Sequence, residues 1–238
     1  LHKAIRRQRQ MCIRDRAKRN RAAFTRNHDL YQNAILRLTE QIRNCMLIHQ
    51  QPESVTARQG RLDSRRVWRE PVLRDSRVFL RSDEESRPGF TVDLMLDGSA
   101  SRLHCQEIIA AQGYILAKSL VSCGIPVRVT SFCSLRGYTV LRVLKDFRRN
   151  DLGNVFDYFA AGWNRDGLAL RAMGELMKSA PADRHLLILL TDASPDDSHK
   201  ILPSGKVPLS RNYDGQAGVD DTAAEVRALR QRGIRTAA

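Results

Sequence analysis

The stretch FTVDLMLDGSAS, residues 90–101, decides the fold. Its first seven residues are apolar at nearly every position, and turn-forming residues bound the run on both sides. A short apolar run of this kind predicts a strand buried on both faces of a parallel sheet. Asp97, Ser99 and Ser101 follow at alternate positions, at the end of the strand where open α/β sheets bind ligands. These oxygen-bearing side chains suit a hard cation such as Mg²⁺, although a polar turn in which Ser101 caps the next helix explains the same pattern.

Strand and helix patterns alternate through the rest of the chain. Apolar runs predict further strands at residues 126–132, 138–144 and 184–190. Helical spacing predicts helices at residues 105–122, 167–179 and 220–232, and a long polar loop covers residues 194–218. This order is typical of a doubly wound α/β domain with a mostly parallel sheet flanked by helices. Because Ile234 begins another strand pattern close to the last residue, Ala238, we expect the domain to lack its final strand and helix.

The chain divides into three predicted parts. Residues 1–60 form a basic extension, helical or disordered, in which residues 28–50 have helical spacing and the first 27 residues are too polar to bury much surface. Residues 61–88 form an Arg-rich linker that we expect to pack along the domain. Residues 89–238 form the α/β domain itself.

The basic residues are concentrated in the N-terminal part of the chain. Of the net charge of +14, residues 1–87 carry +11, from 21 Lys and Arg against 10 Asp and Glu. Such an arm could bind nucleic acid, but it lacks interleaved aromatic residues, and a solvated helix face explains it at least as well. Residues 11–16 also resemble a translated sequencing linker, so the charge of the first residues says little about function. We therefore do not expect nucleic-acid binding and keep it only as an alternative.

Cysteine usage and hydropathy indicate the compartment. The five cysteines are scattered and contain no CxxC pair. The chain shows no apolar leader segment and no apolar run as long as a membrane span. These features predict a reducing, cytoplasmic environment without a membrane span.

Two further polar segments occupy positions comparable with DGSAS. GWNRDGLAL, residues 162–170, lies immediately before a predicted helix, and TDASPDD, residues 191–197, follows the most apolar strand. Because the loops at the carboxyl ends of parallel strands meet on one rim, we expect these segments to converge with DGSAS. The candidate ligands of one cation are then Asp97, Ser99, Ser101, Asn164 or Asp166, and Asp192.

These three motifs, in this order, resemble the von Willebrand factor A (vWA) domain, and DGSAS resembles its metal-ion-dependent adhesion site (MIDAS). More narrowly, residues 60–238 resemble the vWA subgroup of the nitric oxide reductase activation protein and of the CobT-type cobalt chelatase subunit. The features behind this resemblance are GRLD at residues 60–63, DGSAS at 97–101, NRDGLAL at 164–170 and TDASPDD at 191–197.

The resemblance implies a role for each candidate ligand. The hydroxyls of Ser99 and Ser101 would bind the metal directly, and Asp97 and Asp192 would hold coordinated waters or bind directly. The family usually has Thr in its second loop. Here Asn164 stands at that position, and Asp166, two residues on, is the stronger anionic candidate, so the choice between them stays open.

The family also implies a function. We expect a non-enzymatic interaction module dependent on Mg²⁺ or Mn²⁺, with one coordination position open for an acidic side chain of a partner. Such proteins work with a MoxR-type AAA+ ATPase on a client metalloenzyme. This chain has no Walker A stretch, so ATPase activity would belong to the partner. Trp163, His104 and Asp196 are the candidate partner contacts.

An enzyme is the alternative from a different class. A metal-dependent phosphotransferase or hydrolase of the haloacid dehalogenase type also places an Asp at the end of its first strand. It needs a second carboxylate two residues later, where this chain has Ser99. A serine hydrolase would need a GxSxG elbow, which the DGSAS segment does not supply.

Overall fold

The computed structural model describes residues 2–49, 54–74, 76–82, 89–149, 151–202 and 210–238. Its main feature is a five-stranded sheet with the order β10-β7-β4-β5-β6. The strands are β4 (Phe90–Asp97), β5 (Val127–Leu135), β6 (Tyr138–Lys145), β7 (Arg184–Leu190) and β10 (Arg235–Ala237). All neighbours pair in parallel except β6, which runs antiparallel to β5.

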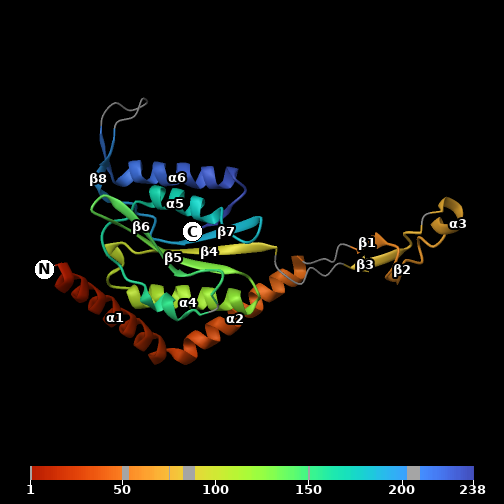
Figure 1. Ribbon diagram of the computed structural model, residues 1–238, viewed down its shortest axis with the longest axis horizontal. Coiled ribbons are helices and arrows are strands. Elements are labelled where there is room, and N and C mark those ends of the chain that lie inside the picture. The colour runs from red at the N-terminus through yellow and green to blue at the C-terminus, as the bar shows by residue number, and fades with distance from the viewer. Residues whose placement is uncertain (1, 50–53, 75, 83–88, 150, 203–209) are drawn as a thin grey trace.

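Helices cover both faces of this sheet (Figure 1). One face carries α4 (Gln106–Ser122), and the other carries α5 (Asp166–Met177) and α6 (Gly215–Gln231). The predicted doubly wound α/β fold is therefore confirmed. The strand expected from Ile234 is β10, and α6 begins five residues earlier than its pattern predicts.

The central strand β4 is buried on both faces, as its apolar sequence predicts. Val92, Leu94 and Leu96 join the core cluster beneath α4, whereas Met95 joins the cluster beneath α5 and α6. All four side chains are completely buried. Since each such side chain stabilises the fold by about 1.5–3 kcal/mol, this strand holds the two layers of helices together.

The N-terminal extension packs closely on the domain. Helices α1 (His2–Arg26) and α2 (His28–His49) run outside α4 (Figure 1). Ala17, Asn20 and Phe24 of α1 are buried, and the Phe24 ring lies 5.2 Å from that of Phe156. The expectation that the first 27 residues bury little is thus wrong. The buried residues are three and four positions apart, so they share one narrow face of the helix, and the polar residues of the other faces hide this pattern in the composition.

Residues 54–82 form a small sheet of their own. The strands β1 (Ser54–Ala57) and β2 (Arg61–Leu62) both pair antiparallel with β3 (Phe79–Ser82), and α3 (Arg69–Leu73) lies between β2 and β3 in sequence. Figure 1 shows this unit apart from the main sheet. The described part of the predicted linker, residues 61–88, thus supplies β2, α3 and β3, and its packing along the domain stays a prediction. Residues 83–88 lie outside the described residues.

The segment predicted as a long polar loop contains two short strands. β8 (Asp197–Ile201) and β9 (Arg211–Tyr213) pair antiparallel at the same end of the sheet as the DGSAS loop. Residues 203–209 lie outside the described residues. Tyr213 is completely buried, and its hydroxyl accepts the Gly167 N–H (3.1 Å) and donates to Asp221 (2.9 Å). This pair of strands is therefore anchored to α5 and α6.

The contact between α1 and the domain generates a stability prediction. The Asn20 side-chain amide donates to the carbonyl oxygens of Phe156 (2.8 Å) and Tyr158 (2.9 Å) in a fully buried position. Asn20→Ala leaves both acceptors unsatisfied, so we expect the free energy of unfolding to fall by about 1–3 kcal/mol in urea titrations. Arg19→Ala, at an exposed position of the same helix, should change it by less than about 0.5 kcal/mol. Equal stability of the two variants would contradict the prediction.

Candidate metal site at the carboxyl edge of the sheet

Hydrogen bonds bring the three polar side chains of DGSAS together. The Ser99 N–H donates to Asp97 Oδ1 (2.8 Å), and the Ser99 hydroxyl donates to Asp97 Oδ2 (3.0 Å). The hydroxyl oxygens of Ser99 and Ser101 are 2.8 Å apart. Because Ser99 gives its only hydroxyl proton to Asp97, Ser101 is the donor in this second contact. These hydrogen bonds therefore run from Ser101 through Ser99 to the buried carboxylate of Asp97.

Backbone contacts fix the position of this loop. The Gly98 N–H donates to the Phe132 carbonyl (2.8 Å), and the Ala161 N–H donates to the Gly98 carbonyl (2.7 Å). A Cβ atom at Gly98 would lie 2.8 Å from the Phe132 oxygen, so this position requires glycine. The Tyr158 hydroxyl donates to the carbonyl oxygen of Asp97. The loop is thus held from β5 and from the segment that precedes α5.

Asp166 lies buried at the start of α5 with its carboxylate unpaired. Its exposed fraction is 1%, and neither carboxylate oxygen has a hydrogen-bond partner among the described residues. Burial, and secondarily the charge of Asp97, raises the pKa of Asp166 to about 7, and the nearby Asn164 amide, which lies beyond hydrogen-bond geometry, opposes part of this rise. A buried anion without a partner is costly, and a bound cation would remove that cost.

Asn164 is occupied by structural contacts. Its amide nitrogen donates to the Ser194 carbonyl (3.0 Å), and its amide oxygen accepts the Asp196 N–H (3.1 Å). The backbones of Asn164 and Asp196 also exchange two hydrogen bonds of 2.9 and 3.0 Å. Asn164 therefore joins the second loop to the third, and the geometry favours Asp166 over Asn164 as a ligand.

Arg102 reaches the first and third loops at once. Its Nε lies 3.8 Å from Asp97 Oδ2, and its guanidinium pairs with the carboxylate of Asp192. Asp192 also accepts the Ser194 N–H through Oδ1 (3.3 Å). Burial raises the pKa of Asp97, although the hydrogen bonds from Ser99 and the charge of Arg102 oppose that rise. The sequence interpretation missed Arg102, because the motif specifies ligands and not their counter-ions.

The predicted partner contacts lie at the surface of the same rim. Trp163 is 45% exposed, and its backbone pairs with Ser134 of β5. His104 is exposed in the turn before α4, and Asp196 is exposed in the third loop. Exposure is compatible with a role in binding a partner, which stays a prediction for all three residues.

The donor set suits a hard cation of the magnesium type. No group of three or more His, Cys, Asp or Glu side chains in the described part of the chain is placed to hold a metal. What the rim offers instead is two hydroxyls beside a small number of carboxylates, in Ser99, Ser101, Asp97, Asp166 and Asp192. Oxygen donors that leave room for coordinated waters fit Mg²⁺ or Mn²⁺ rather than zinc.

Comparisons with known proteins give two curated relatives. The chain is 30% identical over 125 residues to an uncharacterised protein of Pseudomonas aeruginosa, a match that covers 50% of this chain and 18% of that protein. It is 29% identical over 133 residues to the protein NorD of Stutzerimonas stutzeri, which covers 54% of this chain and 20% of NorD. The aligned part therefore spans about a fifth of each relative's length. No protein-family model matches the chain.

Two similar solved structures come from the type V pilus tip protein Mfa5 of Porphyromonas gingivalis. Its three N-terminal domains align with a TM-score of 0.40 at 14% identity, over 50% of this chain and 22% of that one. Its von Willebrand factor domain aligns with a TM-score of 0.38 at 17% identity, over 50% of this chain and 41% of that one.

The sheet order and the position of DGSAS at the end of β4 support a vWA-domain protein, the class that the motifs predict. Within that class, the sequence similarity to NorD supports the NorD type. A domain of this kind fits a protein-interaction module. None of the described helices is long and apolar enough to cross a bilayer.

Asp166 generates a prediction for the metal-free protein. Its folded pKa of about 7 exceeds the ordinary 3.8, so the folded state binds this proton more tightly than the unfolded state. Binding of this proton stabilises the folded state by roughly 4 kcal/mol at most. This stabilisation is complete below about pH 4 and is lost as the pH rises through 7. We expect Asp166→Asn to remove this part of the pH dependence and to stabilise the protein at pH 8, measured by urea unfolding with EDTA between pH 5 and 8.

The matched control is Asp183→Asn, an exposed carboxylate just before β7, at the opposite edge of the sheet. It should follow the pH profile of the parent chain. If Asp166→Asn also follows the parent profile, the carboxylate of Asp166 is not held in the unfavourable environment described above.

Proposed function

We propose that the rim of the sheet binds Mg²⁺ or Mn²⁺ in a MIDAS-type site and uses the ion to recognise an acidic side chain of a partner protein. The observation that carries this proposal is the carboxylate of Asp166, buried without a partner for either oxygen. The hydroxyls of Ser99 and Ser101 and the carboxylate of Asp97 lie in the same rim, and the charge of Asp97 acts on Asp166. A divalent cation would satisfy these oxygens together.

Five residues would hold the ion, either directly or through coordinated waters, because the described carboxylates do not form a three-membered ligand group by themselves. They are Asp97, Ser99, Ser101, Asp166 and Asp192. Asn164 would support the site from outside, since both ends of its amide already have partners. When bound, the ion would supply a positive centre that attracts a carboxylate from another protein. The protein residues contribute orientation, because the backbone contacts of Gly98 and the hydrogen bond from the Tyr158 hydroxyl to the Asp97 carbonyl hold the first loop in place.

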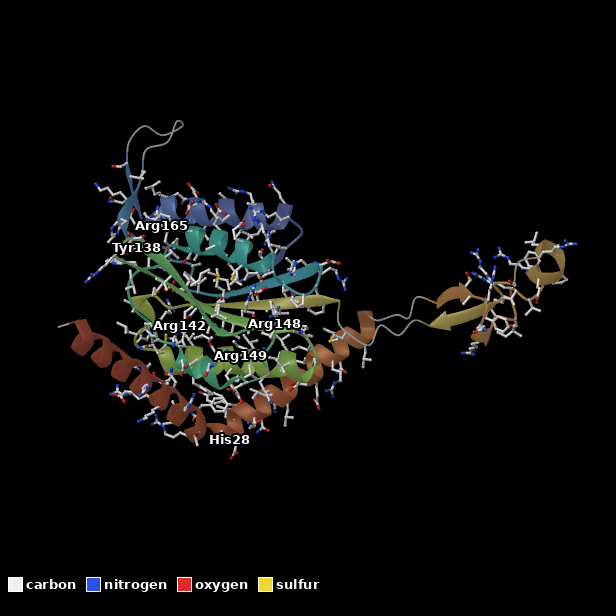
Figure 2. The ribbon with its side chains drawn as sticks, in the orientation of Figure 1. His28, Tyr138, Arg142, Arg148, Arg149 and Arg165 are labelled. Carbon is white, nitrogen blue, oxygen red and sulfur yellow. The ribbon has the colours of Figure 1, made fainter. Side chains whose placement is uncertain are left out.

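The surroundings of the rim suit contact with a protein. Leu103, Leu135, Tyr138 and Trp163 expose between 41% and 76% of their surface next to the three loops. Figure 2 labels Tyr138 at the end of the sheet where β6 begins. Aromatic side chains are enriched at protein interfaces and often contribute much of the binding energy there. These side chains would add contact area around the carboxylate of the partner.

The wider role that we propose is that of an accessory protein. The similarity to NorD, and the subgroup that the motifs resemble, favour work with a MoxR-type AAA+ ATPase in activating, or loading metal into, a client metalloenzyme in the cytoplasm. We propose no catalytic activity for this chain, because Ser99 stands where a phosphotransferase of this topology needs its second carboxylate.

Calorimetric titration with Mg²⁺ and Mn²⁺ at pH 8 tests the site. The parent chain should bind one ion, and Asp166→Asn should weaken binding by about tenfold or more, because it removes one anionic donor while keeping the shape of the side chain. The double variant Ser99→Ala/Ser101→Ala should lose binding as well. Each titration needs a circular dichroism spectrum to show that the variant is folded.

Asp183→Asn is again the matched control, because it removes one negative charge far from the rim. It should bind both ions as tightly as the parent. The proposed metal site is overturned if Asp166→Asn binds as well as the parent. It is also overturned if neither the folded parent nor a folded variant that lacks the Arg102 guanidinium binds either ion.

A further inference from the structure

Arg102 places a cation among the very oxygens that the proposed metal would need. Its Nε lies 3.3 Å from the hydroxyl oxygen of Ser101 and 3.8 Å from Asp97 Oδ2, and its guanidinium pairs with Asp192. The Asp97 side chain is fully buried, whereas that of Arg102 is 21% exposed. One side chain thus balances both flanking carboxylates of the rim.

Arg165, a second arginine near the rim, has other partners. Arg165 pairs with Asp197 at 3.7 Å and lies over the ring of Tyr213, with its guanidinium carbon 4.6 Å from the ring centre. Figure 2 shows Arg165 at the edge of the molecule where β8 leaves the domain. Arg165 therefore does not compete for Asp97 or Asp192, and the counter-ion role falls to Arg102.

A guanidinium and a divalent cation cannot both occupy this position. Each needs the oxygens of Asp97, Ser101 and Asp192, and two positive charges at such short range repel each other. The planar guanidinium donates to several oxygens at once, which is the same task that a metal performs by accepting their lone pairs. The two occupants are therefore alternatives.

We infer that Arg102 is a built-in competitor that closes the metal site, and that metal binding requires it to swing out. This inference rests on the proposed function. Arg102 ends the short 3-10 turn η1 (Ala100–Arg102), where its backbone N–H donates to Ser99 (3.0 Å). The backbone can stay in place while the partly exposed side chain turns outward. Released from Asp192, the guanidinium would face the surface beside the site as a second positive group for an acidic partner.

The same contacts could instead serve only to stabilise the loop. In that case removing Arg102 would loosen the loop and leave metal affinity unchanged or lower. If Arg102 competes with the metal, a variant without Arg102 should instead bind the metal more tightly, because the metal no longer has to displace the guanidinium. The sign of the change in metal affinity separates the two accounts.

The test is a calorimetric titration of the full chain with Mg²⁺ and with Mn²⁺, comparing the parent with Arg102→Gln and Arg102→Lys. We expect Arg102→Gln to bind both ions about tenfold more tightly, a size common for coupling between two binding events. Arg102→Lys should lie between, since it keeps the charge but lacks the planar fork. The control, Arg232→Gln, removes an exposed arginine that pairs with Glu175 at 3.4 Å, and its affinity should equal that of the parent.

Thermal unfolding in EDTA and in Mg²⁺ provides a second readout. Without metal, Arg102→Gln should melt below the parent, because Asp97 and Asp192 lose their counter-ion, and Mg²⁺ should raise its melting temperature by more than it raises that of the parent. If Arg102→Gln does not fold, tighter binding by Arg102→Lys supports the inference, and equal or weaker binding overturns it.

The outcomes separate this inference from the proposed function. If the parent binds metal and neither Arg102 variant binds it more tightly, the competition is overturned and the metal site stands. If Arg102→Gln binds and the parent does not, the competition is supported in its strongest form. If no chain binds either ion, the proposed metal site is overturned, and the inference that rests on it falls too.

Discussion

The structure depends on how the central strand β4 accommodates two carboxylates in a fully buried position. Asp93 and Asp97 lie on the same face of the strand, four residues apart, and both are completely buried. Asp93 pairs with Arg128 of β5, whose Nε lies 2.6 Å from Oδ1 and whose side chain is only 3% exposed. Asp97 is held by Ser99 and Arg102 at the open edge of the sheet. The first pair is sealed in the core and serves the fold, whereas the second is partly open to solvent and can exchange its counter-ion.

The apolar runs predicted the fold well because burial leaves a clear local signal, which is strongest in β4 and β5, the strands that are buried on both faces. The strands β4, β5, β6 and β7 and the helices α4 and α5 all lie where the pattern placed them. The contact surface of α1 gave no comparable signal. Only Ala17, Asn20 and Phe24 among its described side chains are buried, and the Arg and Lys residues around them dominate the composition. The small sheet β1-β3-β2 was missed for a related reason: its strands are two to four residues long, and partners distant in sequence define them.

The candidate site was predictable where its residues are adjacent in sequence. Asp97, Ser99 and Ser101 share one loop, so their convergence follows from the alternation of the motif. The contribution of the second loop did not follow, because Asn164 and Asp166 are two residues apart and only the tertiary contact of Asn164 with Ser194 and Asp196 distinguishes them. Arg102 was missed although it follows the motif directly. Its role depends on reaching Asp192, ninety residues later in the chain, and no spacing rule encodes that contact.

A series of hydrogen bonds connects the N-terminal helix α1 to the rim of the sheet. Asn20 of α1 holds the carbonyl oxygens of Phe156 and Tyr158, and the Tyr158 hydroxyl in turn holds the carbonyl of Asp97. Removing residues 1–60 would therefore not isolate a nucleic-acid-binding arm from a metal site, because it would also expose the core around Phe24 and Ile35 and release the segment that supports DGSAS. Reversing the charge of exposed positions such as Lys18 and Arg19 is the sounder way to separate the two functions. It changes the basic surface of α1 and leaves the buried face, and with it the geometry of the site, in place.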